Sequence, residues 1–151
     1  MINLKKSLKV FEINVIFKYS NTIKNILIKN SPDNIIGSIY KINCNNNNCN
    51  AFYIGQTGRE LKIRIKEHAK AVKNHDQNNS LFNHYLDTGH SFDFDNYSIV
   101  KNIRSFNKRN LLESYLILKT NKNNINLQPG LYSIDKILYS YLEKEFKYIN
   151  V

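Results

Sequence analysis

The chain has 151 residues, which suffices for one domain with short extensions. Its hydrophobic fraction of 42% is that of a globular protein and argues against a disordered chain, although asparagine is abundant. Lys and Arg (22 residues) outnumber Asp and Glu (12 residues), and the net charge of +10 favours a polyanionic partner, of which nucleic acid is the first candidate; a solvated basic surface is the alternative interpretation.

The first 17 residues do not have the pattern of a signal peptide. Two lysines precede an apolar stretch, but Glu12 and Asn14 interrupt it. No segment approaches the roughly 20 apolar residues that cross a membrane. We therefore expect an intracellular protein of the nucleus or cytoplasm that is neither secreted nor associated with a membrane.

Two elements are predicted before the main domain. Apolar and polar residues alternate over residues 10–19, which predicts a half-buried strand, and residues 21–29 favour a short helix. A turn-forming cluster, Ser-Pro-Asp-Asn at 31–34, then indicates a boundary. We expect three parts: an N-terminal extension (1–34), a central domain (35–126) and a C-terminal helical extension (127–151).

A hairpin and a helix are predicted next. Residues 38–42 and 51–56 are rich in β-forming side chains and are separated by a polar loop. Thr57 and Glu60 have the spacing of a capping box, with Thr57 as the N-cap of a helix of about four turns that ends near Asn74.

The rest of the chain alternates helices with one strand. A short helix is expected at 80–87, ending near Gly89, and a third strand at 97–103. Asn107 can cap an apolar helix, and an amphipathic helix follows at 133–146. This order predicts a mixed α/β or α+β layer fold.

Two short motifs in the predicted hairpin resemble the GIY-YIG nuclease family. The first reads Gly-Ser-Ile-Tyr at 37–40, with the glycine one place early, and the second contains Tyr-Ile-Gly at 53–55. The sequence Tyr-Ile-Gly-Gln-Thr-Gly-Arg, with Glu-His at 67–68 and Leu-Glu-Ser at 112–114, is most similar to the endonuclease domain of Penelope-like retroelements. The resemblance covers 37–126 and implies a small three-stranded antiparallel sheet flanked by helices, with the two tyrosines on neighbouring strands.

The resemblance also implies a set of catalytic residues. The family has an arginine and often a histidine on the first helix, and a metal-binding glutamate on a later helix; Arg64, His68 and Glu113 fit. Arg64 would hold the scissile phosphate, Glu113 a Mg²⁺ or Mn²⁺ ion, and His68 would assist proton transfer. Tyr40 or Tyr53 would activate the attacking water, and of these we favour Tyr40.

The same side chains make physical sense from their spacing. Arg64 and His68 lie four residues apart and share a helix face at the border of the apolar stripe, although a basic solvent-facing helix would show the same spacing. Glu113 interrupts an apolar run, and such a carboxylate needs a partner, for example a metal ion, or a place at the solvent margin.

The tyrosines need help to act as bases. A free tyrosine titrates near pH ~10, so cations such as Arg64, Lys41 or the metal would have to lower its pKa. Tyrosines on strands are ordinarily packing residues, so the role of Tyr40 and Tyr53 rests on the resemblance. Gly55 would allow a close approach of the backbone that any side chain would obstruct.

A second metal site is predicted from cysteines and histidines. In a reducing compartment a close cysteine pair is suited to metal binding, and two histidines downstream complete the composition of a Zn²⁺ site. The Penelope-like nucleases carry cysteines and histidines in corresponding places. Four protein ligands close the coordination sphere, so the ion would be structural. The predicted ligands are Cys44, Cys49, His84 and His90.

We therefore expect a metal-dependent DNA endonuclease that nicks DNA and that derives from or serves a Penelope-like retroelement, whose reverse transcriptase would be a further partner. A non-catalytic basic DNA-binding module is the alternative from another class. A homing or repair-type nuclease of the same family is a third hypothesis.

Overall fold

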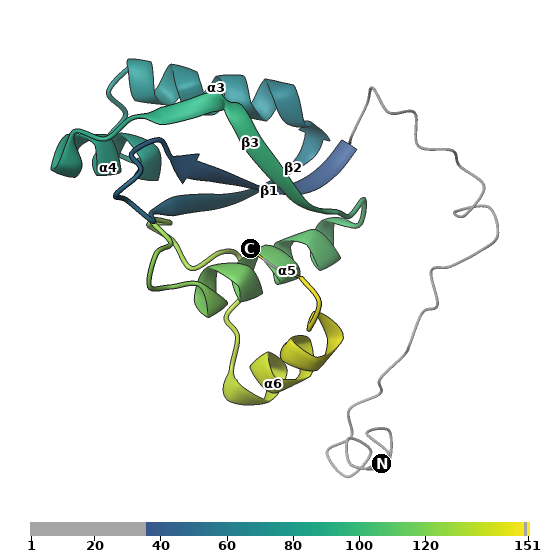
Figure 1. The fold of residues 1–151 in the computed structure, drawn as a ribbon. Helices are drawn as coiled ribbons and strands as arrows, with labels where there is room; N and C mark the ends of the chain where they lie inside the picture. The colour runs from purple at the N-terminus through teal and green to yellow at the C-terminus, as the bar shows by residue number, and fades with distance from the viewer. Residues whose placement is uncertain (1–35, 150) are drawn as a thin grey trace, which may run out of the picture. The chain divides into compact units, whose positions relative to one another are not determined.

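The computed structural model describes residues 36–149 and residue 151 (Figure 1). They belong to one compact unit that spans Pro32–Val151. The strand predicted at 10–19 and the helix predicted at 21–29 lie outside the described residues. The elements, in chain order, are β1 (Ile36–Cys44), β2 (Phe52–Glu60), α3 (Leu61–Lys73), α4 (Ser80–Thr88), β3 (Phe92–Asn102), α5 (Phe106–Lys119) and α6 (Lys136–Glu145).

The three strands form one antiparallel sheet in the order β2-β1-β3. In this register Tyr40 of β1 lies opposite Gly55 of β2 and Ile99 of β3. Figure 1 shows α3 on one side of the sheet and α5 on the other, with α6 beyond α5. The prediction of a three-stranded antiparallel sheet flanked by helices is confirmed.

Residues 37–40 of β1 are buried without a break, so this strand contributes to the core on both faces of the sheet. Ile39 packs with Ile54 and Leu112 in a core that α5 and α6 cover. Tyr40 points to the opposite face and packs with Ile65 of α3 in a second core. Neighbouring residues of the central strand therefore lie on opposite faces of the sheet, and Tyr40 lies on the face that α3 covers.

The helix α3 begins three residues later than predicted, and the capping box is wrong. Thr57 belongs to β2, because this strand keeps pairing with β1 as far as Glu60. The hydroxyl of Thr57 accepts a hydrogen bond from the backbone N–H of Arg59 (3.0 Å) and caps no helix. Glu60 occupies the N-cap position without a side-chain hydrogen bond. Tertiary pairing has overridden a local signal.

Of the remaining elements, one agrees with the prediction and three differ from it at their first residues. The helix α4 agrees with the prediction: Asn79 accepts hydrogen bonds from the first turn, and Gly89 ends the helix at φ 73°. The strand β3 begins earlier than predicted, at Phe92. Ser105, not Asn107, stands at the N-cap of α5. The helix α6 begins at Lys136, three residues after the predicted start.

The outer edge of β2 is covered by the segment 123–126, which follows α5. The N–H of Phe52 donates to the carbonyl oxygen of Asn123 (3.0 Å), and the N–H of Ile125 donates to the carbonyl of Phe52 (3.0 Å). The side-chain amide of Asn126 donates to the carbonyl of Ile54 (2.7 Å) and accepts from its N–H (3.0 Å). An edge strand that carries one of the two motif tyrosines is thus paired on both sides.

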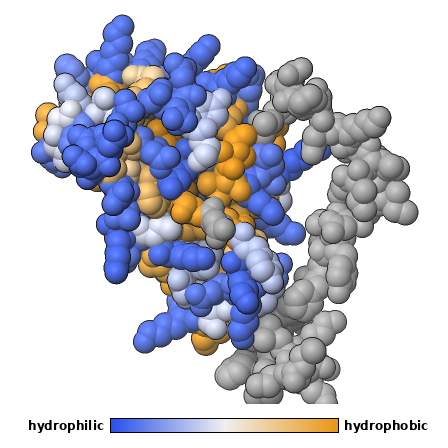
Figure 2. Space-filling view, in the orientation of Figure 1, coloured by the Kyte–Doolittle hydropathy of each residue, from blue (hydrophilic) through white to orange (hydrophobic). Residues whose placement is uncertain are grey.

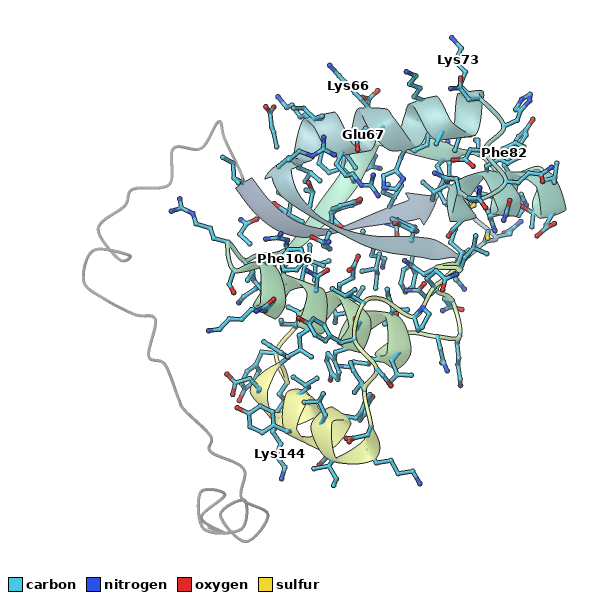
Figure 3. All side chains as sticks on the ribbon, turned by 180° about the vertical axis from the view of Figure 1, so that it is seen from behind. Lys66, Glu67, Lys73, Phe82, Phe106 and Lys144 are labelled. Atoms are coloured by element: carbon cyan, nitrogen blue, oxygen red, sulfur yellow. The ribbon has the colours of Figure 1, made fainter. Side chains whose placement is uncertain are left out.

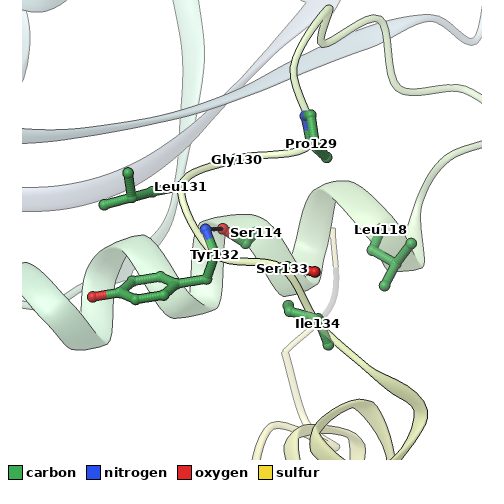
Figure 4. Close-up of a pocket in the computed structure, with 8 residues that line it drawn as sticks. All are labelled: Ser114, Leu118, Pro129, Gly130, Leu131, Tyr132, Ser133 and Ile134. Carbon is green, nitrogen blue, oxygen red and sulfur yellow. Dashed lines mark hydrogen bonds between the residues drawn. The ribbon is translucent and has the colours of Figure 1, made fainter.

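Residues 129–134 cross α5 on their way to α6 (Figure 4). The N–H of Tyr132 donates to the hydroxyl of Ser114 (3.1 Å), which fixes the crossing point. A cavity of about 420 Å³ lies here. None of the residues with a predicted catalytic or metal-binding role lines it. Among the described helices, none is long and apolar enough to cross a membrane.

Candidate active site and metal centre

Three aromatic side chains from three elements meet on the α3 side of the sheet. The hydroxyl of Tyr40 lies 2.7 Å from Nε2 of His68, within hydrogen-bonding distance, and both groups are buried. The ring of Tyr53 lies 5.0 Å from that of His68 and 6.4 Å from that of Tyr40, measured between centroids. The two motif tyrosines are therefore on neighbouring strands and share one histidine.

Gly55 makes room for this group. A Cβ at Gly55 would stand 2.5 Å from the hydroxyl oxygen of Tyr40 and 2.8 Å from the ring of Tyr53. The close approach expected at this glycine is thus made by the two tyrosine rings. Any side chain here would push Tyr40 away from His68.

The phenols stay protonated at neutral pH. Burial raises the pKa of Tyr40, and the charge of Tyr53 adds to this effect, while Arg64 only partly opposes it. Burial also raises the pKa of Tyr53 against the charge of Arg64. Lys41, considered above as a source of positive field, instead has its Nζ 4.2 Å from the centroid of the Phe52 ring. Activation of a phenol therefore depends on a proton acceptor rather than on surrounding cations.

His68 has the properties of that acceptor. Burial lowers its pKa to about 4, and the charge of Arg64 acts in the same direction. The imidazole is therefore neutral at pH 7, with Nε2 beside the hydroxyl of Tyr40. A neutral nitrogen at this distance can take the phenol proton when Tyr40 receives another.

Lowering the pH from 7 to 4.5 is expected to destabilise the protein through His68. In the unfolded chain this group takes up its proton near its usual pKa of 6.5, whereas in the folded protein it does so only near pH 4. The unfolded state binds more protons between these values, so stability falls as the pH falls, by up to about 3 kcal/mol. Urea unfolding at both pH values would show the loss, and it should be smaller in His68→Gln. Equal losses in the two proteins would refute this assignment.

Arg64 lies beside the tyrosines and is held by Glu67. Its Nη1 lies 3.1 Å from a carboxylate oxygen of Glu67, which also pairs with Arg59 at 2.8 Å. Burial by itself would lower the pKa of Arg64, but Tyr40 and Glu67 more than offset this, and the net shift is upward. A permanently charged guanidinium, oriented on one side by a carboxylate, is suited to holding a phosphate.

Glu113 reaches the same region from α5. Burial raises its pKa to about 7, against the charges of Arg64 and Arg109 and a hydrogen bond from the backbone N–H of Gln56. The two arginines and the amide thus offset only part of the cost of burying the charged carboxylate. A divalent cation bound by an oxygen ligand would offset the remainder, so the chemistry of Glu113 fits Mg²⁺ or Mn²⁺.

A polar network that the sequence did not reveal supports Glu113. Arg109, one turn earlier on α5, is buried and donates from Nε to the side-chain oxygen of Gln56 (2.7 Å). Its Nη1 donates to the carbonyls of Ile103 (3.0 Å) and Arg104 (3.2 Å). Gln56 in turn donates to the side chain of Asn110 (3.1 Å). The network holds α5 against β2. In the sequence, the only pointer to it was the spacing of Arg109, four residues before Glu113 on the same helix.

The cysteines and histidines form a separate cluster at the other end of the hairpin. One ligand atom from each of the four residues lies within 4.8 Å of the other three. Sγ of Cys49 is 3.7 Å from Nε2 of His84, a spacing close to that between two ligands of one tetrahedral ion. Both cysteines are free thiols, and Nδ1 of His90 is buried without a hydrogen-bond partner among the described residues. The cluster therefore fits a four-coordinate metal ion. Its members are Cys44, Cys49, His84 and His90.

The structure thus sorts the predicted residues into two groups. Side chains from β1, β2, α3 and α5 form the first group, and side chains from β1, the hairpin loop, α4 and the segment before β3 form the second. The first group consists of Tyr40, Tyr53, Arg64, His68 and Glu113.

Comparison with known proteins gives a family for this arrangement. The model of the GIY-YIG catalytic domain family matches residues 36–126, a range that contains both groups. Neither the curated proteins nor the solved structures contain a match to the chain.

Proposed function

Because the chain belongs to the GIY-YIG family and is an endonuclease that acts on DNA, we propose that it nicks DNA by hydrolysis with one bound Mg²⁺ or Mn²⁺ ion. The observation that carries this proposal is the convergence of a phenol–imidazole pair, a charged guanidinium and an undercompensated carboxylate from both sides of one sheet. Hydrolysis of a phosphodiester needs a base, a cation for the phosphate and a metal ligand, and these groups supply all three.

Each residue has a separate role in the proposed reaction. Arg64 holds a phosphate oxygen and neutralises the charge that develops on it. A water molecule attacks phosphorus; its proton passes to the phenol oxygen of Tyr40, whose own proton passes to Nε2 of His68. The P–O bond to the leaving oxygen breaks in the same displacement, and the leaving oxygen takes up a proton from solvent. Glu113 would hold the metal ion, which would supply charge stabilisation at the phosphate. Tyr53 is the alternative phenol for accepting the proton of the water.

The second cluster is proposed to hold Zn²⁺ as a structural ion. Cys44 and Cys49 flank the turn of the hairpin that carries both tyrosines, whereas His84 lies in α4 and His90 in the connection from α4 to β3. With four protein ligands no position remains for a reactive water. The ion would join two segments that are distant in sequence and would keep the hairpin in place.

The biological context proposed here is a Penelope-like retroelement, in which a nick in the target permits integration and the reverse transcriptase acts on the same DNA. The sequence of the second motif and the cysteine and histidine pairs support this context. The paired cysteines and histidines favour this context over a homing or repair-type nuclease.

The proposed activity is tested with supercoiled plasmid. Conversion to the nicked form is expected with Mg²⁺ or Mn²⁺ and should stop when the divalent ion is left out. Affinity for DNA, measured in parallel, should fall steeply with salt because bound phosphates release condensed counterions. Salt-dependent binding without cleavage under any divalent ion would instead identify a non-catalytic DNA-binding module.

A further inference from the structure

The outer face of α3 is a row of lysines. The four side chains are exposed and are spaced four, four and three residues apart, which places them on one face of the helix, away from the buried Leu61 and Ile65. Figure 3 shows Lys66 and Lys73 projecting away from the sheet. Figure 2 shows that the surface above the sheet, where α3 lies, is largely hydrophilic. The lysine row consists of Lys62, Lys66, Lys70 and Lys73.

The row ends at a groove with aromatic walls. The groove has a volume of about 360 Å³, and its lining contains a lysine and no carboxylate. Tyr85, from α4, is 45% exposed, so part of its ring is open to a ligand. On β3 the aromatic side chains alternate with Asp93 and Asp95, which therefore point to the other face. The lining residues are Val72, Lys73, His75, Tyr85, Ser91, Phe92 and Phe94.

His75 is held in an unusual way at the rim of this groove. It follows α3 with φ 56°, and the bonds from its N–H to Val72 and from the N–H of Asp76 to Ala71 form a Schellman motif. Glycine is the usual residue at this position. Here the imidazole stacks on Phe82 with 5.3 Å between centroids and 23° between planes. A flat ring is thus fixed where a smaller residue would suit the backbone better.

We propose that the groove binds an unpaired nucleobase of the DNA substrate, and that the lysine row on the outer face of α3 binds phosphates of the same DNA. Aromatic walls stack on the face of any base, and a row of cations follows a phosphate backbone. His75 lies eleven residues beyond Arg64, which corresponds to about 16 Å of helix and to about five nucleotides at duplex rise. The proposal rests on the nuclease function proposed above. It makes a junction between duplex and single strand the preferred substrate.

The test compares two fluorescent DNAs in Mg²⁺-free buffer: a blunt duplex, and the same duplex with a five-nucleotide single-stranded tail. By fluorescence anisotropy the wild-type chain should bind the tailed DNA about tenfold more tightly. Tyr85→Ala and His75→Gly should each bind the two DNAs with affinities within about twofold of one another. His75→Gly suits the left-handed backbone, so its fold is retained. Leu86→Ala is the control, because Leu86 is exposed beside Tyr85 but does not line the groove, and it should keep the preference.

Two outcomes would overturn the proposal: equal binding of both DNAs by the wild-type chain, or an unchanged preference in Tyr85→Ala and His75→Gly. Plasmid nicking by the wild-type chain separates this failure from that of the nuclease function. A protein that nicks plasmid but ignores the tail remains a nuclease without the groove site. A protein that prefers the tail through Tyr85 but never nicks has the groove site without the proposed chemistry.

Discussion

Glu113→Gln is expected to lower the rate of DNA cleavage by about a thousandfold or more, because the proposed divalent ion loses its protein ligand. The same change should stabilise the metal-free protein above pH 7. The folded-state pKa of Glu113 is raised to about 7 from 4.5, so the protonated form contributes stability at low pH that is lost as the pH rises between these values. Allowing for partial exposure, relief of the charged form amounts to about 1–2 kcal/mol.

Plasmid nicking and thermal unfolding at pH 8 in metal-free buffer would measure both effects. A variant that is inactive but melts a few degrees higher separates loss of chemistry from loss of fold. Glu145→Gln removes an exposed carboxylate at the end of α6 and should change neither quantity. If Glu113→Gln cleaved DNA as fast as the wild type, Glu113 would not be the metal ligand.

Cys49→Ser is expected to lower the melting temperature by about 10 °C or more and to reduce nicking with it. Binding of a structural Zn²⁺ contributes directly to folding free energy, and loss of one of four ligands removes most of that contribution. Cys49 lies three residues before β2, so the hairpin that carries Tyr40 and Tyr53 loses its tie to α4. Purified wild-type chain should contain one equivalent of Zn²⁺ by elemental analysis, and the variant should contain much less.

Asn48→Ser is the matched control for this experiment. Asn48 is exposed in the same loop and next to Cys49, and its side chain is not part of the cluster. The control should keep its metal and its melting temperature. A metal-free wild type that melts at the same temperature as Cys49→Ser would refute the zinc proposal and leave the nuclease proposal standing.

The fold was predictable wherever local pattern and tertiary structure agree. Two runs of β-forming residues on either side of a polar loop predicted the hairpin, and Gly89 marked the end of α4 correctly. The start of α3 was not predictable in this way. Thr57 carries a local capping signal, but pairing with Ser38 of β1, 19 residues away in sequence, keeps it in the strand. Local rules cannot weigh a competing strand that is distant in the chain.

The candidate site was predictable in its residue types but not in its electrostatics. Spacing placed Arg64 and His68 on one helix face, where the structure has them. The buried pair between Tyr40 and His68 joins positions 28 apart, and the contact of Arg109 with Gln56 joins positions 53 apart. Such contacts leave no periodic trace in a sequence. The upward pKa shifts of the tyrosines follow from burial, which the sequence shows only indirectly.

The pairing of β2 with residues 123–126 has a consequence for motion. Edge strands ordinarily open first, and their amide hydrogens exchange quickly with solvent. Here β2 pairs with β1 on one side, and on the other side the N–H and the carbonyl of Ile54, next to Tyr53, both bond the side chain of Asn126. Opening this strand requires both sets of bonds to break, so its amides should be protected like those of a central strand. Rearrangements during turnover must then occur around a rigid β2, in the DNA and in the side chains that approach it from α3 and α5.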